Sequence, residues 1–85
     1  MGISNQLPDG WRIVDEWRLE KDFKFPDFNH ALKFTNRIGE IADEQGHHPD
    51  VYLTYGEVRL MVWTHKIDGL SESDFILAAK MNDVE

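Results

Sequence analysis

Two stretches near the start of the chain alternate between apolar and polar residues. In residues 16–25, EWRLEKDFKF, the apolar side chains keep to odd positions, and Lys21 is the one exception. A period of two residues is typical of a strand with one buried face. A shorter stretch, residues 11–14, precedes it, and Asp15 with Glu16 can form the turn between the two. The pattern therefore predicts a β-hairpin.

After this hairpin, the spacing of the apolar residues changes to steps of three and four. Pro26 ends the strand because it has no N–H to donate, and Asp27 is placed to cap a helix. The positions with helical spacing are Phe28, Ala31, Leu32, Thr35, Ile38, Ile41 and Ala42. Gly46 then supplies a residue that can turn left-handed. We expect one amphipathic helix over residues 28–45.

The second half of the chain repeats this order. Alternation returns in residues 51–55 and 58–65, on both sides of a turn at residues 55–57. In the later strand, one face carries Val58, Leu60, Val62 and Thr64, and the other carries Arg59, Met61, Trp63 and His65. The second face mixes apolar and charged residues, and either face could pack on the core.

A final helix follows a short connection. Ser71 and Asp74 have the spacing of a capping box, and apolar helix formers continue to Met81. The resulting order, β-β-α-β-β-α, favours an α+β fold with a four-stranded antiparallel sheet and the helices packed on one face. Residues 1–85 are long enough for a single domain, in which residues 1–6 are a candidate for a disordered arm.

Composition narrows the functional classes. The chain has no cysteine, which excludes a disulfide framework and a thiolate metal site. Nine Lys and Arg stand against 16 Asp and Glu, and the net charge of -7 repels nucleic-acid phosphates and anionic membrane surfaces. The sequence shows neither the pattern of a signal peptide nor that of a membrane span, so we expect a cytoplasmic protein. A core this small also favours self-association.

Two adjacent histidines lie at the corner between the first predicted helix and the strand that follows. His47 and His48 stand between Gly46 and Pro49, and antiparallel pairing of the last two strands would bring His65 near them. Imidazole can donate and accept a proton near neutral pH, and three such groups with an orienting carboxylate could perform general acid-base catalysis. Taken singly, the same residues could equally be exposed loop histidines and a strand-end histidine that bonds within the fold.

The full spacing of the polar residues adds a second argument. Its fixed points are Asp43, His47, His48, Pro49, Tyr55, His65 and Asp74. This series resembles the signature of the pterin-4a-carbinolamine dehydratase family. Three further segments also look like that family: GWRIV at 10–14, FKFPDFNHALKFTNRIGEIAD at 23–43 and WTHKIDGLSESDFILAAKM at 63–81.

The resemblance implies a hydro-lyase that uses no metal and no cofactor. It would remove water from a 4a-hydroxytetrahydropterin to give quinonoid dihydropterin, in support of tetrahydrobiopterin recycling. It makes His47 and His65 the proton donors and acceptors, and it makes His48 the residue that binds and orients the substrate. The residues that it places around the substrate are Asp43, Pro49, Trp63, Thr64 and Trp11, with Trp11 as a cover over the pocket. We expect a homodimer or homotetramer that binds a pterin, and no direct contact with nucleic acid or membrane.

Two other functions compete with this hypothesis. In animals the family that the chain resembles also acts as a dimerisation cofactor for a homeodomain transcription factor, so a protein-interaction module or transcriptional coactivator is the first alternative. Three imidazoles and a carboxylate could also ligate zinc or iron, which is the second.

Overall fold

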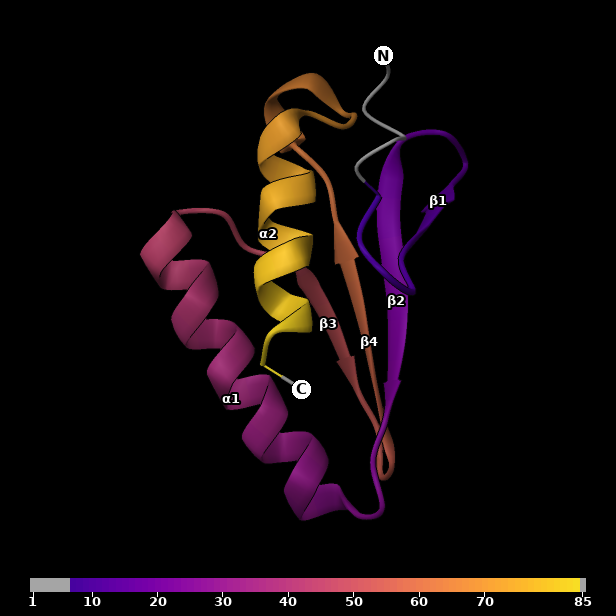
Figure 1. Cartoon of the computed structure of the whole chain (residues 1–85), viewed down its shortest axis with the longest axis vertical. Helices are drawn as coiled ribbons and strands as arrows, with labels where there is room; N and C mark the ends of the chain where they lie inside the picture. The colour runs from indigo at the N-terminus through magenta and orange to yellow at the C-terminus, as the bar shows by residue number, and fades with distance from the viewer. Residues whose placement is uncertain (1–6, 85) are drawn as a thin grey trace.

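The computed structural model of the chain describes residues 7–84. Its elements are β1 (Arg12–Val14), β2 (Arg18–Lys24), α1 (Phe28–Gln45), β3 (Asp50–Leu53), β4 (Glu57–Val62), a 3₁₀ helix (His65–Ile67) and α2 (Glu72–Asn82) (Figure 1). The predicted order of strands and helices is confirmed. The candidate arm, residues 1–6, lies outside the described residues.

All neighbouring strands of the sheet are antiparallel, in the order β1-β2-β4-β3. The first hairpin turns at Asp15 and Glu16, as predicted, and both residues have positive φ angles (54° and 71°). The central ladder joins β2 to β4, and Leu19 pairs there with Val62. The sheet therefore ends at β1 on one side and at β3 on the other.

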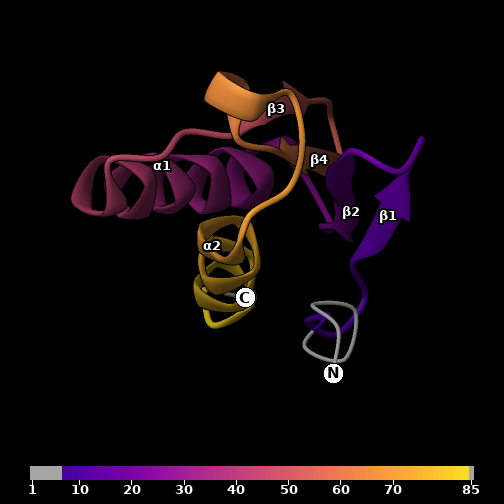
Figure 2. The same ribbon diagram turned by 90° about the horizontal axis from the view of Figure 1, so that it is seen from above.

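The core lies between one face of this sheet and the two helices (Figures 1 and 2). On that face β4 contributes Val58, Leu60 and Val62, and all three are fully buried. They belong to one cluster with buried residues of both helices, among them Ile38 of α1 and Met81 of α2. The structure thus decides which face of β4 packs on the core, a choice that its alternating sequence left open.

Helix α1 has the predicted bounds, but its buried stripe differs from the predicted one. Asp27 caps its start by accepting the His30 N–H (2.9 Å), and the buried residues are Ala31, Phe34, Ile38 and Ala42. Phe34 was not among the predicted positions, although its ring packs on Phe23 and Phe25. Phe28 and Leu32 were predicted on the apolar face and are instead exposed. Helical geometry explains this, because these two residues lie to the side of a stripe centred on Ile38.

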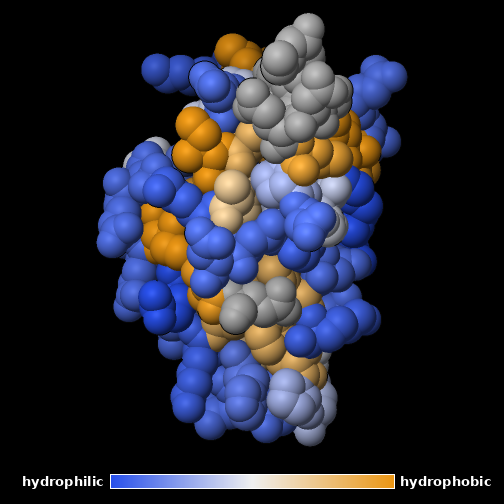
Figure 3. Space-filling model, viewed as in Figure 1, coloured by the Kyte–Doolittle hydropathy of each residue, from blue (hydrophilic) through white to orange (hydrophobic). Residues whose placement is uncertain are grey.

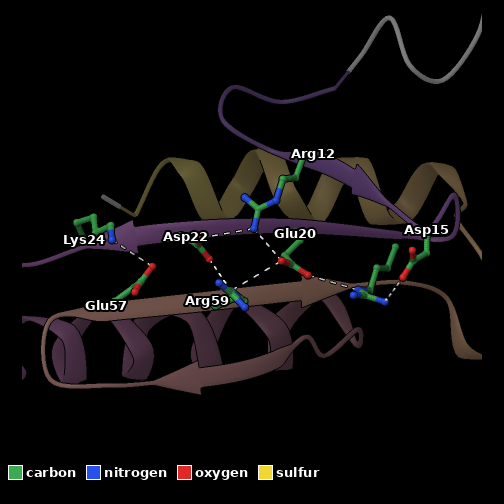
Figure 4. A network of polar contacts seen from close by, with 8 residues as sticks. Arg12, Asp15, Glu20, Asp22, Lys24, Glu57 and Arg59 are labelled. Atoms are coloured by element: carbon green, nitrogen blue, oxygen red, sulfur yellow. Dashed lines mark hydrogen bonds and ion pairs between the residues drawn. The ribbon is translucent and has the colours of Figure 1, made fainter.

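The opposite face of the sheet carries a network of charged side chains (Figure 4). Arg12 of β1 lies 2.7 Å from Glu20 of β2, and Arg59 of β4 lies 2.7 Å from Asp22 of β2. The hydrogen bond from Arg59 is the main cause that lowers the pKa of Asp22 below its ordinary value of 3.8; nearby positive charges act in the same direction. The network links three strands on the face that the helices leave uncovered.

The surface seen from the helix side is mostly hydrophilic, with separate hydrophobic patches (Figure 3). Tyr52 and Tyr55, in the β3–β4 hairpin, are among the exposed large apolar side chains. Within residues 7–84, no helix is both long and apolar enough to cross a membrane.

Candidate active site

The end of α1 fixes the backbone of the first histidine. Gly46 adopts the left-handed conformation (φ 64°, ψ 29°), as predicted. The Gly46 N–H donates to the Asp43 carbonyl (3.3 Å), and the His47 N–H donates to the Ala42 carbonyl (3.1 Å). These two bonds form a Schellman motif, which holds His47 at the point where the chain leaves the helix.

The imidazole of His47 meets a carboxylate from the second helix. His47 Nε2 lies 2.5 Å from Asp74 Oδ1; the Asp74 side chain is fully buried, and 19% of the His47 side chain is exposed. An ionised carboxylate can only accept hydrogen bonds, so Nε2 carries the proton of this contact. The ring is therefore oriented by Asp74 and presents Nδ1 as its second nitrogen.

Asp74 also connects the start of α2 to the segment that follows β4. Its Oδ2 accepts the Ser71 N–H (2.8 Å), which is the carboxylate half of a capping box, and the Thr64 hydroxyl (2.7 Å). Thr64 Oγ1 lies 2.7 Å from Ser71 Oγ as well. Since Thr64 directly precedes His65, this cluster connects the surroundings of His47 to the chain segment that carries the third histidine.

The second histidine of the pair contacts a different carboxylate. His48 Nε2 lies 2.9 Å from Asp43 Oδ1. Both side chains are exposed, His48 at 63% and Asp43 at 80%. The two adjacent rings therefore bind carboxylates on different helices, and His48 remains accessible to a ligand.

The third histidine does not end a strand, contrary to the prediction. Strand β4 stops at Val62, and His65 begins the 3₁₀ helix that follows. The cause is a tight local bridge, in which the Thr64 N–H donates to the Gly69 carbonyl (2.8 Å) and turns the chain away from the ladder. The exposed imidazole of His65 stacks on the Trp63 ring at 4.5 Å with 20° between the planes.

Trp11 lies in the core, which does not fit the predicted role as a cover over the site. It is only 4% exposed, and its Nε1–H donates to Asn82 Oδ1 (3.0 Å) in the last turn of α2. Asp74 lies in the first turn of the same helix, eight residues before Asn82, and eight helical residues correspond to roughly 12 Å. The Trp11 ring therefore bonds to the end of α2 that lies away from the contact between His47 and Asp74. Pro49 is half-buried and directly follows His48.

The structure thus links the predicted residues in three contacts. His47 and Thr64 share Asp74, His48 pairs with Asp43, and His65 stacks on Trp63. An imidazole whose orientation is set by a carboxylate can pass a proton at its free nitrogen, and exposed imidazoles can bind a polar ligand. Across residues 7–84, no three His, Asp or Glu side chains come together in a way that could hold a metal ion.

Asp74 is the site residue that sequence reasoning placed only in part. Its spacing from Ser71 identified it as the second residue of a capping box, with Ser71 as the cap, and such a residue usually lies partly exposed in the first helical turn. Its position in the series Asp43, His47, His65, Asp74 was the signal for a further contact. Nothing in that spacing indicated a bond to His47, because the two residues lie 27 positions apart and meet only through the packing of α1 on α2.

The comparisons with known protein sequences agree on one family. Residues 2–84 match the family model described as pterin 4 alpha carbinolamine dehydratase. A relative from Alkaliphilus metalliredigens, whose name places it among the pterin-4-alpha-carbinolamine dehydratases, is 50% identical over 78 residues, which cover 92% of this chain and 70% of the relative. A second relative of that name, from Rubrobacter xylanophilus, is 52% identical over 80 residues, or 94% of this chain and 74% of the relative.

Solved structures agree with the sequence comparison. A transcriptional coactivator/pterin dehydratase from Brucella melitensis superposes with a TM-score of 0.84 at 35% identity, covering 91% of this chain and 83% of that one. A pterin dehydratase-like protein, described as a RuBisCO assembly factor in the alpha-carboxysome, has a TM-score of 0.75 at 19% identity over 88% of each chain. At that identity, the second likeness concerns the fold alone.

Proposed function

Since the chain belongs to the pterin 4 alpha carbinolamine dehydratase family, we propose that it removes water from a 4a-hydroxytetrahydropterin. The product is a quinonoid dihydropterin, which a later reduction returns to the tetrahydropterin pool. The observation that carries the proposal for this chain is the His47 imidazole, which is held by a buried carboxylate beside the end of β4.

The dehydration can proceed by two proton transfers alone. The C4a–oxygen bond breaks as the leaving hydroxyl gains a proton and departs as water. N5 loses its proton, and the electron pair of the N5–H bond forms the C4a=N5 double bond. General acid-base catalysis of this kind contributes roughly 100- to 10,000-fold to a rate.

The three histidines divide these tasks in the proposal. His47 and His65 exchange the two protons on either side of the pterin ring, and His48 binds and orients the substrate. Asp74 keeps the His47 ring in one orientation, and Asp43 does the same for His48. Thr64 bonds to Asp74 and directly precedes His65, and its neighbouring backbone near Trp63 can bind the amide edge of the pterin.

A stopped assay of the purified chain with synthetic 4a-hydroxytetrahydropterin tests the proposal. We expect dehydration well above the spontaneous rate, and we expect His47→Ala and His48→Ala each to lower it at least about tenfold. His30→Ala is the matched control, because His30 is an exposed histidine at the other end of α1 and bonds to Asp27 (2.7 Å).

Circular dichroism should show the native fold in all three variants, since the substituted side chains lie at helix ends. Near-normal turnover in both the His47 and the His48 variants would rule out the assigned roles. A loss of the same size in His30→Ala would show that the effect is not specific to the site.

A protein-interaction role is the second candidate. It is favoured by the similarity to the Brucella melitensis protein, which is described as both a coactivator and a pterin dehydratase. A chain that acts only as an interaction module would not dehydrate the substrate above the spontaneous rate. The assay above therefore tests whether the chain has the enzymatic function.

A further inference from the structure

The imidazole of His65 is held differently from those of the other two histidines. His47 and His48 each bond to a carboxylate, whereas no hydrogen bond or ion pair engages the His65 side chain among residues 7–84. The backbone of His65 is fixed, because its carbonyl accepts the Asp68 N–H (3.3 Å) at the end of the 3₁₀ helix. A group that exchanges a proton with a bound substrate also needs a defined ring orientation, so another contact has to supply it.

An aromatic ring supplies that contact. The Trp63 and His65 rings lie with their centroids 4.5 Å apart and 20° between their planes, which is a stacked arrangement. Stacking on a larger ring restricts the rotation of the imidazole about its side-chain bonds. An indole face also attracts a positive charge within about 6 Å, so the stack persists when His65 carries an added proton. Trp63 can therefore hold the imidazole in both of its protonation states.

A second indole ring holds Trp63 in place. The Trp17 and Trp63 rings stand at 87° to each other with their centroids 5.1 Å apart, and this edge-to-face contact is favourable between aromatic rings. The Arg18 guanidinium lies 5.0 Å from the centroid of the Trp17 ring and gives that ring a further contact. The rings of Trp17, Trp63 and His65 thus form a continuous series of contacts.

The first hairpin determines where the Trp17 ring lies. The Trp17 N–H donates to the Val14 carbonyl (3.2 Å), which closes the turn between β1 and β2. The pairing of Leu19 with Val62 then brings the start of β2 next to the end of β4, which Trp63 directly follows. The orientation of the third histidine therefore depends on a segment that is distant in the sequence.

We propose that Trp63 is a positioning residue for the dehydration, which holds the His65 imidazole in the orientation from which it exchanges a proton, and that Trp17 supports Trp63 from the first hairpin. This inference rests on the proposed function, in which His65 is one of the two groups that exchange protons. The role differs from substrate binding in its kinetic effect. Loss of a binding surface raises KM, whereas loss of a positioned proton-transfer group lowers kcat.

Steady-state kinetics of the purified chain with synthetic 4a-hydroxytetrahydropterin test this role. Trp63→Leu keeps an apolar side chain and removes the ring, and we expect kcat to fall about tenfold while KM stays within about twofold. Trp63→Phe keeps a ring that can stack, so its kcat should stay within about twofold of the wild type. Trp17→Leu should lower kcat less than Trp63→Leu does. Phe28→Leu, the same kind of change at an exposed ring of α1, is the control and should alter neither value.

Proton NMR of the histidine rings reports the stack independently of activity. Protons above an indole face resonate upfield, and the signals of His65 are identified by their loss in His65→Asn. We expect these signals to move downfield in Trp63→Leu, to keep most of their upfield shift in Trp63→Phe, and to stay unchanged in Phe28→Leu. Signals that do not move in Trp63→Leu would refute the contact on which the inference depends.

The kinetic outcomes separate this inference from the proposed function. If the wild type dehydrates the substrate and Trp63→Leu only raises KM, or changes neither value, positioning by Trp63 is refuted and the dehydratase function stands. An equal loss in Trp63→Phe and Trp63→Leu refutes it as well, because the phenyl ring can still stack. A wild-type kcat in Trp17→Leu would refute the support from the first hairpin. If the wild type does not accelerate dehydration, both proposals fall. Circular dichroism of each variant confirms that a loss of activity is not a loss of fold.

Discussion

At the scale of single residues, the site depends on one carboxylate with two duties. Asp74 accepts bonds from the backbone at the start of α2 and from the imidazole of His47 at the end of α1. The first duty could be predicted from the sequence, since Ser71 and Asp74 have capping-box spacing. The second could not, because a bond between distant residues depends on how two helices pack. The same holds for the burial of Trp11, whose sequence position allowed a place over the site as well as one in the core.

Asp74→Asn tests these duties separately, because it keeps an oxygen for the cap and removes the charge. We expect kcat to fall about tenfold or more, since the amide holds the His47 ring less firmly, and we expect a small change in the free energy of unfolding. Asp74→Ala removes both functions and should also lower that free energy by about 2–3 kcal/mol. The turnover of the two variants measures the effect on kcat, and their urea unfolding measures the effect on the free energy of unfolding. An equal loss of stability in Asp74→Asn and Asp74→Ala would contradict this separation of the two roles of Asp74.

At the scale of elements, the sequence predicted all four strands and both α-helices, but it missed the 3₁₀ helix at His65–Ile67 and was less informative about which faces are buried. The bounds of α1 follow from Pro26, Asp27 and Gly46, which act locally. The buried stripe of α1 depends on its partners, and the aromatic contacts of Phe34 with β2 could not be read from spacing alone. The choice of face for β4 was open for the same reason.

The charged face of the sheet gives a prediction on pH. Because Arg59 lowers the pKa of Asp22, the ion pair stabilises the fold above the ordinary pKa of 3.8, and this contribution is lost as the pH falls through the lowered value. Asp22→Asn should therefore reduce the free energy of unfolding at pH 7 by less than about 1 kcal/mol, as is usual for a partly exposed pair. The difference from wild type should shrink as the pH falls below 3.8.

Urea unfolding across this pH range measures the effect. Asp50→Asn is the matched control: Asp50 pairs with Met61 on the same sheet and makes no ion pair within residues 7–84. A difference between wild type and Asp22→Asn that stays constant from pH 7 to pH 2 would contradict the assigned role of Arg59.

At the scale of the whole molecule, the two open edges of the sheet determine how two copies of the chain can associate. Strand β3 is an edge strand with the exposed ring of Tyr52, and an unprotected edge in so small a domain favours pairing with another chain. We expect a dimer or larger assembly at micromolar concentration. Tyr52→Lys should weaken the association about tenfold, whereas Tyr55→Lys in the adjoining turn should not.

Sedimentation analysis of the wild type and both variants tests this expectation. A wild-type monomer at tens of micromolar would refute self-association. Equal weakening by the two lysines would show that the contact does not involve the edge of β3.

The shared carboxylate of Asp74 has a consequence for how the protein can change over evolution. A substitution that improved the beginning of α2 at the expense of this side chain would also remove the hydrogen bond that orients the imidazole of His47. A residue that kept an oxygen for the cap could be tolerated by the fold while it weakened the hold on that imidazole. In related proteins that keep the fold but have lost the activity, we expect this aspartate to be retained more often than the histidine to which it bonds.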